Sequence, residues 1–285
     1  MFGKKTQEKL ARRMRRSNEF MLREISDGLD SIRSAQDIPL EFYDGFWRAR
    51  ESLEYQAAFT EREPLVSICT ATFNRPEVLL ERTLPSVLNQ SYKNIEYIVV
   101  GDGVDEQAYK RLLEVDDPRF HFVNLQERGQ YPLNPELRWM VAGGVPLNKA
   151  LELSRGRFVT HLDDDDAYAS DRIEKLVNFA QSQKLDFIWH PFYTESESGE
   201  WQINEAQNFT HGQVTNSGVF YHQWLNTLPF DLQSYRYREP GDWNRFRKFK
   251  HLGVNAARFP EALLYHYREG SQKASSSNFQ YRDTQ

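Results

Sequence analysis

The sequence of 285 residues contains a single cysteine, Cys69, inside an apolar run. One thiol excludes an intrachain disulfide framework and a cysteine-rich zinc site, and it fits a reducing compartment. No apolar stretch approaches the roughly 18 residues that a membrane-spanning helix needs, and the N-terminus lacks the apolar core of a signal peptide. We therefore expect a cytoplasmic protein that does not cross a membrane.

The sequence also lacks an excess of positive charge. The formal net charge is -5 and the isoelectric point is near 5.9, so the chain has no overall basic field and we expect no nucleic-acid partner. Apolar residues make up 39% of the sequence and aromatic residues 14%. This content is enough to bury a large core, which excludes a disordered chain and favours one large domain with an appendage.

The appendage is predicted over residues 1–63. Between Leu10 and Ile32, apolar residues recur at spacings of three, four and seven, the period of an amphipathic helix with a narrow apolar stripe. The first half of this helix is strongly basic, so it could lie on an anionic membrane surface or bind an acidic partner. Packing on the body or on a second copy is the alternative. A further helix is expected over residues 41–59, and Pro64 marks the start of the main domain.

From Leu65 onward, short β-branched strands alternate with helical stretches. The runs LVSICTATF and IEYIVVGDG indicate strands, and the segment between them has helical spacing, which predicts a β-α-β unit. The alternation continues to RFVTHLDDDD, where four aspartates follow a strand. The pattern predicts an α/β domain over residues 64–270, with a Rossmann-like, mostly parallel sheet flanked by helices, and a flexible tail over residues 271–285.

The four aspartates, Asp163 to Asp166, need an explanation because adjacent carboxylates repel one another and demand a cation, a ligand or open solvent. Ligands of open α/β sheets bind outside the carboxyl ends of the strands, so Asn74, Asp102 and the aspartates should meet at one rim. Aspartate oxygens suit Mg²⁺ or Mn²⁺, which also bridge phosphate oxygens. A helix cap is the alternative, but one helix start does not need four carboxylates, and the segment lacks the spacing of a calcium loop.

The ordered motifs resemble the inverting family 2 glycosyltransferases, nucleotide-sugar enzymes of the GT-A fold. The likeness runs from Leu65 to Arg268 and rests on VSICTATFNRPEVLLERTLPSVLNQSYKNIEYIVVGDG and GVPLNKALELSRGRFVTHLDDDDAY. In that family the first strand ends in a turn that lines the nucleotide pocket, and an L-D-x-D-D motif binds metal and the ribose-diphosphate. The resemblance implies a donor nucleotide-binding set of Thr70, Thr72, Asn74, Arg75, Asp102, Asn148, Asp163 and Asp164.

The same resemblance implies a site for Mn²⁺ or Mg²⁺. Asp163 and Asp165 match the metal motif, and His266 follows the base helix where related enzymes can place a further ligand. A metal at this position stabilises the charge that develops on the leaving diphosphate. A structural histidine explains His266 equally well.

A general base is implied by the segment YREPGDWNRFRKF, which resembles the family segment where an acid followed by Asp-Trp opens a helix. Asp242 occupies the base position, with Glu239 as the runner-up and Trp243 on the acceptor side. From the residues alone, a helix cap at Asp242 or Glu239 explains the segment equally well.

The implied activity is metal-dependent, inverting transfer of a sugar from a nucleotide-diphosphate sugar to a hydroxyl of a glycan, lipid-linked or protein acceptor, as in polysaccharide biosynthesis. Two other classes remain open: a catalytically silent nucleotide-sugar binding or scaffold module, and a nucleotidyltransferase. Binding alone needs no base, and a nucleotidyltransferase would normally carry a glycine-rich, basic loop near its first strand, which CTATFNRPEV lacks. The candidate base and the absence of such a loop both favour sugar transfer.

Overall fold

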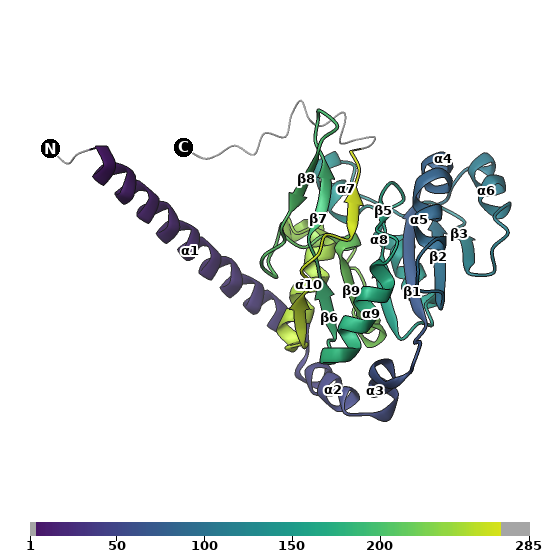
Figure 1. Cartoon of the computed structure of the whole chain (residues 1–285), viewed down its shortest axis with the longest axis horizontal. Coiled ribbons are helices and arrows are strands. Elements are labelled where there is room, and N and C mark those ends of the chain that lie inside the picture. The colour runs from purple at the N-terminus through teal and green to yellow at the C-terminus, as the bar shows by residue number, and fades with distance from the viewer. Residues whose placement is uncertain (1–3, 269–285) are drawn as a thin grey trace.

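The computed structural model describes residues 4–268, which form an α/β body with one long helix projecting from it (Figure 1). The helices are α1 (Lys4–Asp37), α2 (Leu40–Arg50), α3 (Leu53–Thr60), α4 (Pro76–Val78), α5 (Leu84–Leu88), α6 (Glu106–Leu113), α7 (Pro135–Val141), α8 (Gly144–Leu153), α9 (Arg172–Gln183) and α10 (Gly241–Leu252). A π-helical turn, η1 (Leu79–Thr83), joins α4 to α5, and short 3-10 helices are η2 (Asn216–Gly218), η3 (Gln223–Thr227) and η4 (Ser234–Tyr237). The tail expected over residues 271–285 lies outside the described residues.

The strands form two sheets. They are β1 (Val66–Thr72), β2 (Ile95–Gly101), β3 (Phe120–Asn124), β4 (Phe158–His161), β5 (Ala167–Tyr168), β6 (Phe187–Trp189), β7 (Phe192–Glu195), β8 (Trp201–Asn204), β9 (Val219–His222), β10 (Ala256–Arg258) and β11 (Leu264–His266). The central sheet has the order β10-β6-β9-β4-β1-β2-β3, and the smaller sheet has the order β5-β11-β7-β8. In the central sheet only β9 runs antiparallel to its neighbours, which confirms the predicted mostly parallel sheet.

The core lies around β1, β2 and β4. All seven residues of β2 are buried, and β4 is buried throughout. Such continuous apolar strands are typical of a parallel sheet covered on both faces. Strands β1 and β2 pair from Val66 opposite Ile95 to Thr72 opposite Gly101, and β4 lies on the other side of β1. The carboxyl ends of these strands therefore share one edge of the sheet.

The smaller sheet brings a distant part of the chain to this edge. Strand β11 pairs antiparallel with β5 and parallel with β7, and it ends at His266. Strand β5 begins at Ala167, directly after the four aspartates. The pairing of β5 with β11 thus places His266 next to residues that precede it by about a hundred positions.

The described part of the predicted appendage consists mainly of three helices. Helix α1 projects from the body as a single rod, and α2 and α3 pack below the sheet (Figure 1). Phe46 of α2 is fully buried, and the Tyr55 hydroxyl of α3 donates a hydrogen bond of 2.8 Å to the buried Asp186 carboxylate. Among the described residues, no helix is both long and apolar enough to cross a bilayer.

Candidate active site

A pocket of about 460 Å³ opens at the carboxyl ends of the central strands. This volume is in the range of small-ligand sites. The polar and aromatic side chains that line it are Thr72, Phe73, Arg75, Asp102, Arg128, Tyr131, Trp139, Asp163, Asp164, Asp165, Thr215, Asn216, Phe230, Asp231, Asp242 and His266. Asp102 and three of the four consecutive aspartates therefore line one pocket, as the strand pattern predicts.

The four aspartates form a tight turn between β4 and β5. The Asp166 backbone N–H donates to the Asp163 carbonyl across 3.1 Å, and the Asp163 N–H donates to the Ser217 hydroxyl across 3.0 Å. Before the turn, the buried Thr70 hydroxyl donates to the Leu162 carbonyl across 2.6 Å. Because the backbone turns here, neighbouring carboxylates no longer alternate between two faces as they would on a strand.

Arg75 neutralises part of this acidic turn. Its guanidinium pairs with the Asp164 carboxylate and, across 2.7 Å, with Asp165. The Thr72 hydroxyl also donates to Asp164 across 2.7 Å. Burial raises the pKa of Asp164 to about 7 even though Arg75 opposes the shift. The turn thus accumulates more negative charge than one arginine offsets, a condition that favours a bound cation.

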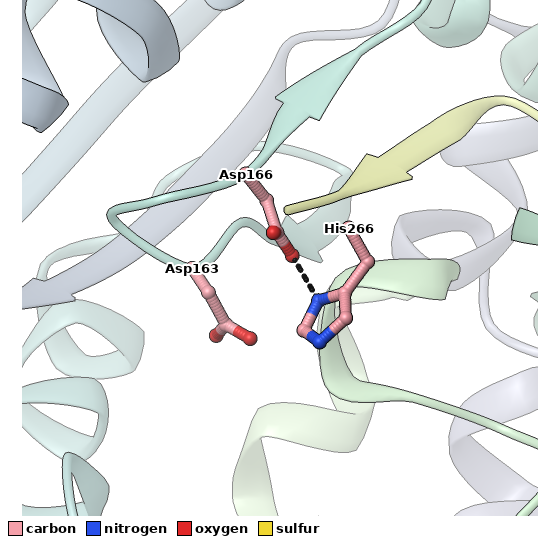
Figure 2. A group of neighbouring side chains, drawn as sticks. All are labelled: Asp163, Asp166 and His266. Carbon is pink, nitrogen blue, oxygen red and sulfur yellow. Dashed lines mark hydrogen bonds and ion pairs between the residues drawn. The ribbon is translucent and has the colours of Figure 1, made fainter. Parts of the chain in front are cut away.

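Asp163, Asp166 and His266 form a candidate metal group, with one ligand atom of each within 4.8 Å of the others. Their side chains turn toward one another, from the turn and from the end of β11 (Figure 2). Asp166 is fully buried and bonds His266 Nδ1 across 2.8 Å, and its other oxygen accepts the Tyr267 N–H across 3.1 Å. A carboxylate on one ring nitrogen is the usual support for a histidine that ligates metal through the other nitrogen.

The sequence-based metal set of Asp163, Asp165 and His266 stays a prediction, and the grouping of side chains in the structure differs from it in one member. The structure groups Asp166, not Asp165, with Asp163 and His266, and it pairs Asp165 with Arg75. The physical reason is the turn, which directs the Asp165 carboxylate toward α4 and the Asp166 carboxylate toward β11. Asp165 still lines the pocket, whereas Asp166 lies behind His266.

The surroundings of His266 favour the protonated form of its imidazole. Burial alone would lower the pKa of its imidazole, but the hydrogen bond with Asp166 and the charges of Asp163 and Asp165 raise that pKa to about 9. The imidazolium therefore supplies positive charge that a divalent cation would replace. Because a ligating imidazole must be neutral, cation binding would release this proton.

Asp242 lies on the pocket wall in the first turn of α10. Its Oδ1 accepts the Trp243 N–H across 2.7 Å, and burial followed by the charge of Asp163 raises its pKa to about 6. The N-cap residue of α10 is Pro240, yet the Asp242 carboxylate bonds a backbone N–H of the first turn, so a helix-capping role and a role as base both stay open in this geometry. A carboxylate near a helix N-terminus with a pKa close to neutral suits a general base.

Glu239, the alternative base, is engaged elsewhere. Its carboxylate accepts two hydrogen bonds from Arg247, at 2.6 and 3.0 Å, and one of 2.7 Å from Asn244. It is 3% exposed and is not among the pocket-lining residues. Arg247 also bonds Ser34 and Asp37 of α1. This geometry disfavours Glu239 as the base: its carboxylate holds Arg247, and Arg247 in turn contacts α1.

We expect the substitution Glu239→Gln to lower stability and not the chemical rate. Removing one partner of a buried ion pair costs up to about 3–5 kcal/mol of the free energy of unfolding, and we expect a loss of about half of this or more because Arg247 would keep only the partly exposed Asp37 as its counter-charge. Urea denaturation measures this loss. Glu61→Gln is the matched control, since the ion pair of Glu61 with Arg157 is partly exposed and should cost less than about 1 kcal/mol. Unchanged stability with lost transfer would restore Glu239 as the base.

Trp243, predicted on the acceptor side, is not among the pocket-lining residues. It is 4% exposed, its indole N–H donates to Asp30 of α1 across 3.2 Å, and its ring packs edge-to-face on Phe209. One residue along a helix turns the side chain by about 100°, so adjacency to Asp242 does not bring Trp243 to the pocket. Trp139 is the tryptophan that lines the pocket, and it is 69% exposed.

Three members of the predicted donor set, Thr70, Asn74 and Asn148, do not line the pocket but bond backbone groups near it. Thr70 ties β1 to the aspartate turn. Asn74 has a positive φ of 49° and accepts the Asp105 N–H across 2.9 Å, which positions the start of α6. Asn148 exchanges two hydrogen bonds with the backbone of Phe230, at 2.8 and 3.0 Å. Thr72, Arg75, Asp102, Asp163 and Asp164 line the pocket as expected.

The sequence marked Arg128, in the loop after β3, as a candidate phosphate or base contact, but it did not predict that this loop binds Asp102. Asp102 accepts hydrogen bonds of 2.8 Å from the Gly129 N–H and the Tyr131 hydroxyl, which holds this loop over the pocket. The Arg128 guanidinium lies 3.7 Å from the centre of the Phe73 ring. The aromatic and arginine content of the loop was a weak signal, because nothing in the sequence pairs it with Asp102.

The comparison with protein families gives a match to glycosyl transferase family 2 over residues 67–132 and 141–245. A putative teichuronic acid biosynthesis glycosyltransferase of Bacillus subtilis is 31% identical over 146 residues, 49% of this chain and 51% of the relative. An uncharacterised glycosyltransferase of Methanocaldococcus jannaschii is 28% identical over 199 residues, 64% of each chain. The chain thus spans between half and two thirds of these relatives.

Among solved structures, S. aureus TarS in complex with UDP-GlcNAc superposes with a TM-score of 0.58 at 19% identity, over 74% of this chain and 60% of that one. This likeness supports the GT-A fold that the sequence motifs imply. The family match covers more than half of the sequence and includes the aspartate turn and the start of α10. The chain belongs to glycosyl transferase family 2.

Proposed function

We propose that this protein transfers a sugar from a nucleotide-diphosphate sugar to an acceptor hydroxyl, with inversion at the anomeric carbon. The observation that carries the proposal is that Asp163, His266 and Asp242 line one pocket. A site for a cation and a carboxylate with a near-neutral pKa are the two elements that this reaction needs. Inversion follows from a single base that activates the attacking hydroxyl on the face opposite the leaving group.

The charge of the pocket supports cation dependence. Six aspartates line it, against two arginines and one histidine. A diphosphate brings further negative charge, so it would be repelled unless a cation lies between the phosphates and the carboxylates. Asp163 and His266, with Asp165 at the pocket surface, would hold Mn²⁺ or Mg²⁺, and the bound ion would stabilise the charge of the leaving diphosphate.

The remaining pocket residues divide between the donor and the acceptor. Arg75, which now pairs with Asp164 and Asp165, is placed to contact phosphate once a cation satisfies those carboxylates. The wall around Asp102 and Tyr131 would receive the nucleoside. Trp139, exposed at the pocket, would stack on the acceptor sugar, replacing Trp243 in that role.

The acceptor is proposed to be a growing glycan on a lipid carrier. Two relatives support this class: an Escherichia coli β-1,3-glucosyltransferase that acts on a GlcNAc-diphosphoundecaprenol, 26% identical over 133 residues, and a Campylobacter jejuni β-1,3-glucosyltransferase named for a diNAcBac-PP-undecaprenol substrate, 34% identical over 119 residues. A catalytically silent module would not need Asp242 on the pocket wall, which disfavours that alternative.

A thermal-shift panel tests the donor class. The protein is heated with uridine, guanosine and thymidine diphosphate sugars, each with Mn²⁺ or with a chelator. We expect at least one nucleotide sugar to raise the melting temperature only when the metal is present, because a ligand that binds the folded state stabilises it by mass action. A panel in which no nucleotide sugar shifts the melting temperature would contradict the proposal.

The transfer rate should fall on the acid side of neutrality. A raised pKa means that Asp242 takes up its proton at a higher pH than an ordinary aspartate, and the protonated form cannot act as a base. With saturating donor and metal, we expect the rate to decrease through an apparent pKa at or below about 6, since a cation near Asp163 removes part of the upward shift. Rates between about pH 5 and 8 measure this, and a rate that rises toward acid pH would oppose it.

A further inference from the structure

Helix α1 carries an apolar surface that the body does not cover. We define the α1 stripe as Met14, Met21, Leu22, Ile25, Leu29 and Ile32. These side chains are between 49% and 67% exposed. At 100° per residue they fall within an arc of roughly 100°, so they form one continuous face of the helix. Phe20, 64% exposed, lies outside this arc.

The other side of α1 holds the helix to the body. Asp30 and Ser34 bond Trp243 and Arg247 of α10, Asp37 pairs with Arg247, and Asp27 pairs with Lys250. These four anchoring residues of α1 lie on the side of the helix opposite the stripe by the same helical geometry. The body therefore cannot fold over the stripe while these contacts hold. Figure 1 shows the rest of α1 extending away from the sheet.

Charge indicates what covers the stripe. Residues 4–26 contain eight lysines and arginines and three glutamates, a net charge of +5, while the whole chain has a net charge of -5. The rest of the chain therefore carries -10, and the positive charge is concentrated on the projecting part of α1. Its described basic residues are Lys9, Arg12, Arg13, Arg15, Arg16 and Arg23, all exposed and all outside the arc of the stripe.

We propose that α1 lies in the surface of a bilayer that contains anionic phospholipids. The stripe would enter the boundary between headgroups and acyl chains, and the basic residues would contact the headgroups. Pairing of two α1 helices is disfavoured because it would bring two segments of +5 together, whereas anionic headgroups offset the same charge. The proposal is independent of the donor chemistry, because no residue of the stripe lines the pocket.

Vesicle sedimentation of the full chain tests this surface. Large vesicles of phosphatidylcholine alone are compared with vesicles that contain a quarter phosphatidylglycerol. We expect the partition coefficient to be about tenfold or more higher on the anionic vesicles, and to fall as salt screens the headgroups. Equal, weak partitioning onto both vesicle types would overturn the proposal.

Two double variants separate the stripe from general apolar exposure. Met21→Glu with Ile25→Glu should reduce partitioning onto anionic vesicles about tenfold or more, because the stripe would carry charge into the acyl boundary. The matched control is Leu40→Glu with Leu53→Glu, which alters residues that are 72% and 91% exposed on α2 and α3. The control should bind like the wild type.

Two further readouts keep the result unambiguous. Donor binding, measured by thermal shift, should be the same in all variants, which shows that the body is folded. Sedimentation velocity reports self-association. A wild-type dimer that dissociates in the Met21→Glu, Ile25→Glu variant, without binding of the wild type to anionic vesicles, would assign the stripe to a second copy of the chain and overturn the bilayer proposal.

Discussion

Asp242→Asn is expected to cut sugar transfer about a hundredfold or more while leaving donor and cation affinity close to wild type. The amide keeps the size of the carboxylate and can still accept the Trp243 N–H at 2.7 Å, so the start of α10 should not move. What it loses is basicity. A proton removed only from the acceptor affects the transition state of transfer and not the binding of the donor, which confines the effect to the rate.

The matched control for this variant is Asp231→Asn. Asp231 lines the same pocket, and its Oδ1 accepts the Gln233 N–H across 2.8 Å, so the control removes an equal charge from the same cavity. We expect its transfer rate to stay within a few-fold of the wild type. Transfer rates and donor affinities of both variants are measured with saturating metal. A fully active Asp242→Asn protein would remove Asp242 from the mechanism.

The second large effect is expected from Asp163→Asn, which should abolish metal-dependent binding of nucleoside diphosphate. Asp163 and His266 are shared by the candidate metal group of the structure and the ligand set implied by the sequence, and Asp163 is the carboxylate of the two. An amide carries no charge to offset that of a divalent cation, so the metal and the diphosphate should both be lost. We expect diphosphate affinity in Mn²⁺ to fall about a hundredfold or more.

Calorimetric titration with and without a chelator measures this effect. The wild type should bind nucleoside diphosphate only with Mn²⁺, and the variant should bind it equally weakly under both conditions. Asp231→Asn again serves as the control, because it should retain metal-dependent binding. If Asp163→Asn keeps the metal dependence of the wild type, the cation must be held elsewhere in the pocket.

Local sequence patterns were sufficient to predict the sheet and its carboxyl edge. The strands Val66–Thr72 and Ile95–Gly101 are rich in β-branched residues, and the segment between them has helical spacing. Because parallel strands end at one edge, Asp102 and the aspartate turn could be placed together before any contact was known. The prediction depends only on periodicity and chain direction, which local sequence records well.

Side-chain direction within turns and helices could not be predicted in the same way. Which of Asp165 and Asp166 joins His266 depends on the turn geometry and on the pairing of β5 with β11, a contact across about a hundred residues. Trp243 and Glu239 lie on either side of Asp242 in sequence, yet Trp243 bonds Asp30 of α1, more than two hundred positions away. Glu239 bonds Arg247, which in turn pairs with Asp37 of α1. Sequence proximity to a base therefore does not indicate proximity to its substrate.

Proton NMR of donor cleavage in the presence of Mn²⁺ tests the proposed metal-dependent, inverting transfer most directly. A nucleotide sugar selected by the thermal-shift panel is incubated with the protein, with water as the acceptor, and the anomeric signals of the released sugar are followed before mutarotation. We expect metal-dependent release of a sugar whose first-formed anomer is inverted relative to the donor. Release of the retained anomer, or cleavage that continues at the same rate after chelation of the metal, would contradict it.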